Sequence, residues 1–164
     1  MKYQHFWPPN DIYFGGGAAS VIDEMSLITN ERNYLFVNLN QYSLRSTSRN
    51  KNINKIIIII SSSRLMPLAL FWLDNIKNVI AVFDTSTPVS EMIKKISLYR
   101  RNGDKITAGR RECNFKISNK DIMKMKYFLT ESGMEEIQDR FMNSPSTLYR
   151  WRKEVAMKFG VRDP

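Results

Sequence analysis

The chain has 164 residues, with 25 Lys and Arg against 16 Asp and Glu, so its formal net charge is +9. A hydrophobic fraction of 43% is enough for a folded core and excludes a wholly disordered chain, while the positive charge favours an anionic partner, nucleic acid or anionic membrane. The single cysteine and single histidine, Cys113 and His5, exclude an intramolecular disulfide and are too few for a structural zinc site.

The start of the chain lacks the apolar segment of a secretory signal, since it reads MKYQHFWPPNDIYF. The most apolar run covers residues 56–60 and is far shorter than the roughly 20 residues that a membrane-spanning helix needs. We therefore expect a soluble protein of the reducing cytoplasm, with no membrane partner.

The first two thirds of the chain alternate short apolar runs with amphipathic stretches. Strands are predicted at residues 34–39 (YLFVNL), 55–60 (KIIIII), 79–83 (VIAVF) and 106–108. Helices are predicted at residues 18–28, 65–73 and 89–99, the first of them weakened at its start by Gly15–Gly17. Strands that alternate with helices predict an α/β fold with a mostly parallel sheet.

Everything after Ile117 has a helical pattern. Segment 100–114 is charged, contains two glycines and is predicted to end one domain, residues 1–112, and to begin a second, residues 113–164. Three short helices are predicted in the second domain, with Ser118, Ser132 and Ser144 preceding them as helix-capping residues. Together they can share one small core, so this domain is predicted to be all-α.

The last of these helices carries the basic charge of its domain. Leu148, Val155 and Phe159 are spaced to face a core, and the remaining face carries Thr147, Tyr149, Arg150, Arg152 and Lys153. Residues 144–162 hold five basic residues and one acid, whereas residues 117–143 hold four basic residues and five acids. A helix of this kind suits the major groove of DNA, where Arg and Lys neutralise phosphates and a few side chains reach base edges.

The segment SPSTLYRWRKEVAMKFGVR resembles the helix-turn-helix of LuxR-type regulators, and the resemblance runs without a gap from residue 117 to residue 162. By this resemblance Tyr149, Arg150 and Lys153 would approach bases, and Ser146, Thr147 and Arg152 would hold phosphates. Tyr149 stands where the family usually has a basic residue, and Trp151 where it usually has His. The family normally adds a fourth, dimerising helix, so the resemblance leaves two alternatives: a truncated chain, or a protein that pairs in another way.

The N-terminal domain resembles a response-regulator receiver, a flavodoxin-like fold, with residues 5–7 as its first strand. Receiver chemistry needs clustered carboxylates after the first strand, an Asp after the third, Ser or Thr after the fourth and Lys after the fifth. Here Asp11 is the one acid near the first position, the third reads VNLN with no carboxylate, Ser61 fits the fourth, and Asp84-Thr85 brings no Lys to the fifth. The resemblance therefore implies a degenerate receiver that has lost phosphoryl transfer.

The stretch WPPNDIYFGG resembles the start of regulators of the enterobacterial common pilus (Ecp or Mat fimbria) and of related atypical LuxR-type fimbrial regulators. The resemblance implies a non-enzymatic transcription regulator of fimbrial, adhesion or biofilm genes, without metal or other cofactor. Its expected partners are double-stranded DNA and a second subunit, in a homodimer or a heterodimer with another regulator. The alternative is an interaction adaptor whose basic last helix docks an acidic protein.

Overall fold

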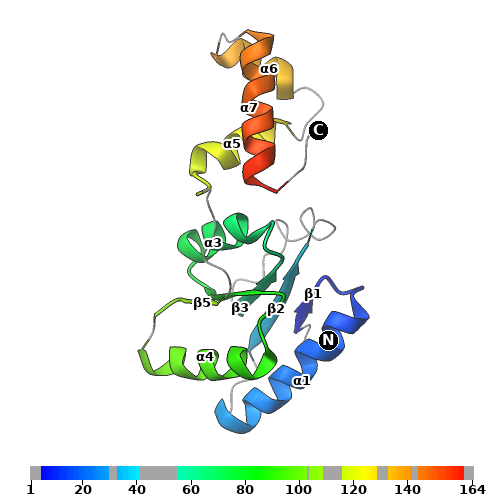
Figure 1. The fold of residues 1–164 in the computed structure, drawn as a ribbon, viewed down its shortest axis with the longest axis vertical. Coiled ribbons are helices and arrows are strands. Elements are labelled where there is room, and N and C mark those ends of the chain that lie inside the picture. Colours follow the sequence, from blue (N-terminus) through cyan, green and yellow to red (C-terminus); the bar gives the residue numbers. More distant parts are fainter. Residues whose placement is uncertain are drawn as a thin grey trace. The chain divides into compact units, whose positions relative to one another are not determined.

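The computed structural model describes residues 5–29, 33–40, 55–102, 104–108, 116–128, 133–141 and 144–160. The chain divides into two units, Met1–Glu112 and Cys113–Pro164, which are described separately (Figure 1). None of the described helices is long and apolar enough to cross a membrane.

The first unit is built on a five-stranded, fully parallel sheet, which confirms the predicted α/β class. In chain order its strands are β1 (Phe6–Trp7), β2 (Tyr34–Leu39), β3 (Ile56–Ser61), β4 (Val79–Asp84) and β5 (Ile106–Ala108). All six residues of β4 are buried, as are five of the six in β2. Such burial on both faces explains why these strands read as continuous apolar runs rather than as alternating ones.

The order of the strands differs from that of a complete flavodoxin-like sheet. Neighbouring strands follow the chain order β1-β2-β3-β4-β5, whereas the flavodoxin-like order is 2-1-3-4-5. This unit therefore does not have the predicted flavodoxin-like order, in which the first strand lies inside the sheet. As a result the two-residue β1 is an edge strand, a place where a short strand followed by Pro8 and Pro9 loses few hydrogen bonds.

Helices cover both faces of this sheet. One face holds a buried cluster to which α1 (Ile12–Thr29) contributes Val21 and Met25 and α4 (Val89–Asn102) contributes Ile93 and Ile96, and these two helices pack together. The described part of α3 (Met66–Asn75) contributes nothing to that cluster and packs on β3 and β4 from the other face (Figure 1). The outcome is a three-layer unit.

Helix α1 begins earlier than the sequence predicts, because it includes all three glycines. It starts at Ile12, directly after Asp11, whose carboxylate accepts a hydrogen bond from the Phe14 amide at 3.0 Å. This is the N-cap arrangement that favours helix initiation. A Cβ built on Gly15 would lie 2.5–2.8 Å from three atoms of the Phe6 ring, so the glycine lets the ring of the edge strand approach the helix.

Replacing Gly15 by alanine is therefore expected to destabilise the first unit relative to Gly16→Ala. At Gly16 a Cβ meets nothing within 4 Å, so alanine there should stabilise the helix by about 0.5–1 kcal/mol. At Gly15 alanine brings the same gain in helix propensity, but it must also displace the Phe6 ring. This displacement should lower the free energy of unfolding by about 1–3 kcal/mol. Chemical unfolding of both variants measures the difference.

A third variant, Gly17→Ala, serves as a replicate, since a Cβ at Gly17 also meets nothing within 4 Å. Equal stabilisation of all three variants would show that the contact between Gly15 and Phe6 does not constrain the helix.

The second unit contains three described helices: α5 (Asn119–Phe128), α6 (Gly133–Phe141) and α7 (Pro145–Lys158). Both α6 and α7 pack on α5, and α6 also packs on α7. The most deeply buried apolar side chains of this unit are Ile117, Ile137, Leu148, Val155 and Phe159. Ser132, and residues 103 and 109–114 of the segment expected to hold the linker, lie outside the described residues.

Candidate nucleic-acid interface

Helix α7 begins at a well-formed cap. Ser144 has an extended backbone, and its hydroxyl accepts a hydrogen bond from the Thr147 amide at 3.4 Å. The same hydroxyl lies 2.9 Å from that of Ser146 and 3.0 Å from that of Thr147. Pro145 occupies the first turn, where its missing N–H costs nothing. Thus three hydroxyl groups gather at the positive end of the helix dipole, an environment that favours anions.

The inward side of α7 fixes the helix in its unit. Leu148, Val155 and Phe159 are at most 4% exposed. These residues recur at helical spacing and form one stripe. The helix ends at Lys158, with Phe159 as its C-cap residue, and Gly160 follows with φ 71°, a left-handed conformation that favours glycine. The buried stripe therefore determines which side chains of α7 point outward.

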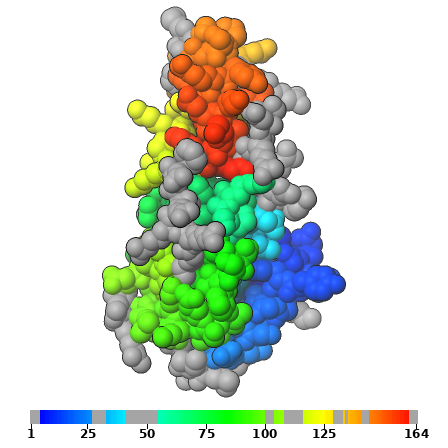
Figure 2. Space-filling view, in the orientation of Figure 1, coloured from blue at the N-terminus to red at the C-terminus, as the bar shows by residue number. Residues whose placement is uncertain are grey.

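The outward side carries most of the residues that the sequence predicts for DNA contact. Ser146, Tyr149, Arg150, Arg152 and Lys153 are exposed, Tyr149 at 57%, whereas Thr147 is half-buried beside the cap. In the space-filling view, α7 (orange to red) forms a broad exposed surface of its unit (Figure 2). With about 100° between successive residues, Ser146, Arg150 and Lys153 lie nearly opposite the buried stripe, and Arg152 lies near its edge.

Met157 also belongs to this outward side, although the sequence does not predict it there. It is 53% exposed and follows Lys153 by four residues, which places it one turn further along the same side. Its i+4 spacing from Lys153 is the sequence signal that could have identified it.

Arg150 lies near a carboxylate of its own helix, that of Glu154. Its Nε lies 3.8 Å from Glu154 Oε1, and the two side chains are 71% and 59% exposed. An ion pair so exposed contributes little free energy, and a phosphate or a base edge can compete with it readily.

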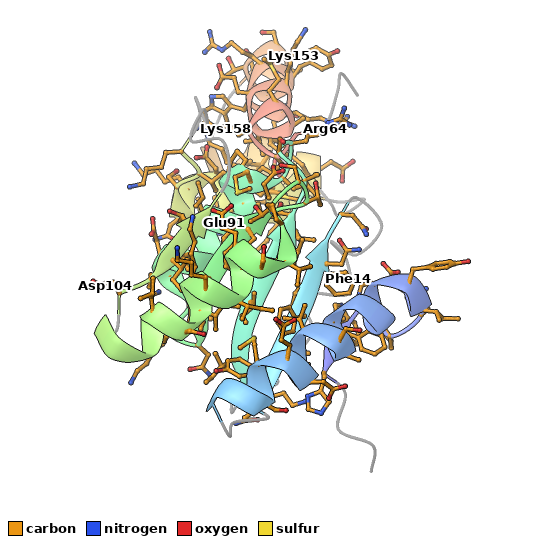
Figure 3. The ribbon with its side chains drawn as sticks, turned by 60° about the horizontal axis from the view of Figure 1, so that its bottom comes forward. Phe14, Arg64, Glu91, Asp104, Lys153 and Lys158 are labelled. Carbon is orange, nitrogen blue, oxygen red and sulfur yellow. The ribbon has the colours of Figure 1, made fainter. Side chains whose placement is uncertain are left out.

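A partly buried ion pair joins α7 to α5. Lys158 Nζ donates to both carboxylate oxygens of Asp121, at 2.9 and 3.0 Å, and Asp121 also accepts from the Ser118 amide and hydroxyl at 2.8 and 2.7 Å. Burial alone would raise the pKa of Asp121, but the hydrogen bonds from Ser118 and Lys158 outweigh it and hold the pKa below 3.8, its ordinary value. Figure 3 labels Lys158 and Lys153, which lie on different turns of α7.

Asp121→Asn is expected to destabilise the second unit at neutral pH by about 1–2 kcal/mol, because a hydrogen bond between ionised groups is lost. A carboxyl with a lowered pKa stabilises the fold above its ordinary pKa, and this contribution disappears as the pH falls through the folded-state pKa. The stability gap between parent and variant should therefore shrink below about pH 4. Thermal unfolding between pH 7 and pH 3 measures it, and a gap that stays constant would contradict this assignment.

A second contact between the same helices involves an aromatic ring. Lys124 Nζ of α5 lies 4.1 Å from the ring centroid of Trp151, a cation–π distance. Trp151 itself is half-buried at the side of α7, between Arg150 and Arg152. The contact brings a cation of α5 next to the basic part of α7.

The residues that the sequence predicts for a degenerate receiver site lie at the carboxyl ends of the parallel strands. Asn38 Nδ2 donates to Asp11 Oδ2 at 2.8 Å. Asp84 is buried and accepts from the Ser63 hydroxyl at 2.9 Å and from the Ser86 amide and hydroxyl at 2.9 and 2.6 Å. Ser61 is buried, and its hydroxyl donates to the Ser62 carbonyl at 3.1 Å. Within the described ranges, no three His, Cys, Asp or Glu side chains are grouped as a metal site would require.

Beside Asp11 there is an open hollow of about 600 Å³. Its walls come from the WPPNDIY stretch, residues 7–13, together with Asn40. Ile12 and Tyr13 at its edge are 80% and 95% exposed.

Comparison with known proteins gives two matches. Residues 2–99 match the model of the EcpR N-terminal domain family. Over 168 aligned positions the chain is 65% identical to the Vi polysaccharide biosynthesis protein TviA of Salmonella typhi, and the match covers 100% of this chain and 93% of that protein. No solved structure matches the chain significantly.

Proposed function

Because the chain belongs to the EcpR N-terminal domain family, we propose that it is a DNA-binding transcription regulator of genes for a surface polysaccharide or for fimbriae. The polysaccharide is suggested by the name of its 65% identical relative, and the fimbriae by the resemblance of its WPPNDIYFGG stretch. In this proposal the second unit is a LuxR-type helix-turn-helix, in which α7 is the recognition helix.

The outward side of α7 is the observation that carries this proposal. Arg150 and Lys153 lie three residues apart on the side opposite the buried stripe, with the exposed Tyr149 beside them. Arg and Lys are the side chains that most often read guanine in the major groove. The hydroxyl groups at the start of the helix lie where a DNA phosphate would meet free amides.

The first unit supports regulation without phosphoryl transfer. Asp11, the acid nearest the expected metal position, has its two oxygens held by the Phe14 amide and the Asn38 amide group. Where a receiver carries its phosphorylated Asp, the chain carries Asn38 and Asn40. A carboxamide forms no acyl phosphate of this kind, so we assign this unit a role in protein contacts.

Pairing of two subunits is part of the proposal. A single three-helix module covers only a few base pairs, and useful affinity usually comes from two modules placed about one helical turn of DNA apart. The first unit would supply the contacts of a homodimer or of a heterodimer with another regulator.

The test is binding to a pool of fragments from the genome that encodes the chain, measured at two salt concentrations. We expect a discrete motif to be enriched at both concentrations, since base contacts persist when salt weakens phosphate contacts. Weak binding of every fragment, abolished by salt, would refute sequence-specific regulation and favour an adaptor whose basic helix docks an acidic protein.

A further inference from the structure

We propose that α5 contributes a second line of DNA-backbone contacts beside α7, made by Lys120 and Lys124. This inference rests on the proposed function and adds a surface to it. The partner group is the DNA phosphate, and the role of these lysines is to add affinity and fix orientation without reading sequence.

The charge of the second unit is divided unequally between α5 and α6. Helix α5 (NKDIMKMKYF) has three lysines and one aspartate, and that aspartate, Asp121, is already paired with Lys158. Helix α6 (GMEEIQDRF) has three acids and one arginine. The small net negative charge of residues 117–143 is therefore the sum of a basic helix, α5, and an acidic helix, α6. The basic helix is the one whose lysine reaches α7.

The spacing of the lysines places two of them on one side of α5. Lys120 and Lys124 are four residues apart and so lie one above the other, whereas Lys126 lies about 200° around the helix from Lys124. Lys120 is exposed and Lys124 half-buried. Lys158 is unsuited to a third contact of this kind, because Asp121 holds its ammonium at 2.9 Å.

The ring of Trp151 connects this lysine side to α7. Lys124 Nζ lies 4.1 Å from the ring centroid, and the neighbours of Trp151 in the chain are Arg150 and Arg152. A lysine side chain held over a ring loses less conformational freedom when it meets a phosphate. The two helices thus present neighbouring cations, and DNA whose groove receives α7 would bring a backbone strand towards α5.

The test compares two variants that each remove one charge from α5, Lys124→Gln and Lys126→Gln. The measured quantity is the slope of log affinity against log salt concentration for the full chain on its enriched site and on unrelated DNA. Lys124→Gln should reduce the magnitude of the slope by about 1 on both DNAs, because one fewer counterion is released. Lys126→Gln should leave the slope near that of the parent, and Lys120→Gln/Lys124→Gln should reduce it by about 2. Lys124→Arg, which retains charge and stacking, should restore the parental slope.

The outcomes separate this inference from the proposed function. If the parent prefers its site but Lys124→Gln and Lys126→Gln have equal slopes, the α5 contacts are refuted and sequence-specific binding stands. If the parent has no preferred site yet Lys124→Gln alone reduces the slope, the α5 contacts stand and base reading by α7 is refuted. If the chain binds no DNA, both are refuted.

Discussion

Replacement of Arg150 and Lys153 by alanine is expected to abolish the preference for the enriched DNA site and to leave only weak, salt-sensitive binding. Both side chains lie on the exposed side of α7, opposite the stripe formed by Leu148, Val155 and Phe159. Each contact to a base edge contributes about 1–3 kcal/mol, so the pair should account for about 2–6 kcal/mol of discrimination. Even the lower value corresponds to roughly a 30-fold loss of preference.

A matched control removes the same charge from the other unit. Arg64 (Figure 3) and Lys94 are both exposed, and Arg64→Ala/Lys94→Ala lowers the net charge by the same two units without changing α7. Titration of site and non-site DNA at constant salt gives the preference of each protein. If both double variants lose affinity equally on all DNA, Arg150 and Lys153 act through charge alone and α7 reads no bases.

The α/β class was predictable because each central strand of the sheet has a recognisable pattern in its own short stretch of sequence. The runs YLFVNL, IIIII and VIAVF are short, apolar and rich in β-branched or aromatic residues, and helical patterns separate them. Burial of β2 and β4 on both faces is the physical cause of those runs. A pattern of this kind requires no knowledge of which strand pairs with which.

The order of the strands and the start of α1 depend on contacts that local patterns do not contain. The position of β1 at the edge follows from its pairing of Phe6 with Phe36, thirty residues away. The helical conformation of Gly15–Gly17 follows from the Asp11 cap and from the Phe6 ring that lies against Gly15. A run of three glycines alone has poor helix propensity, which is why the sequence favours a later start.

For the candidate site, the sequence predicts the buried and exposed sides of α7 but not the contacts that α7 makes with other helices. The cap at Ser144, the buried stripe and the exposed cations of α7 all follow from spacing within a single helix. The pairs Asp121–Lys158 and Lys124–Trp151 join residues 37 and 27 positions apart. Periodicity cannot pair residues on different helices, so the position of the basic side of α5 beside α7 emerges only from the folded unit.

Ile137→Ala is expected to abolish DNA binding without changing any residue that would face DNA. Ile137 of α6 is fully buried, and removing its side chain should cost about 2–5 kcal/mol. A small unit such as Cys113–Pro164 gains only a few kcal/mol from its core, so most of its stability would be lost. Hydrogen exchange should show the amides of α7 losing protection, while those of β2, β3 and β4 keep it, because the first unit has its own core.

Gln138→Ala is the control for this effect, since Gln138 is the exposed neighbour of Ile137 on the same helix. An exposed position of this kind usually changes stability by no more than about 0.5 kcal/mol, so its DNA binding should equal that of the parent. If Ile137→Ala leaves α7 protected and DNA binding intact, the second unit does not depend on the shared core of α6 and α7. The exposed side of α7 would then be fixed by α5 alone, through Asp121, Lys124 and the helix packing between them.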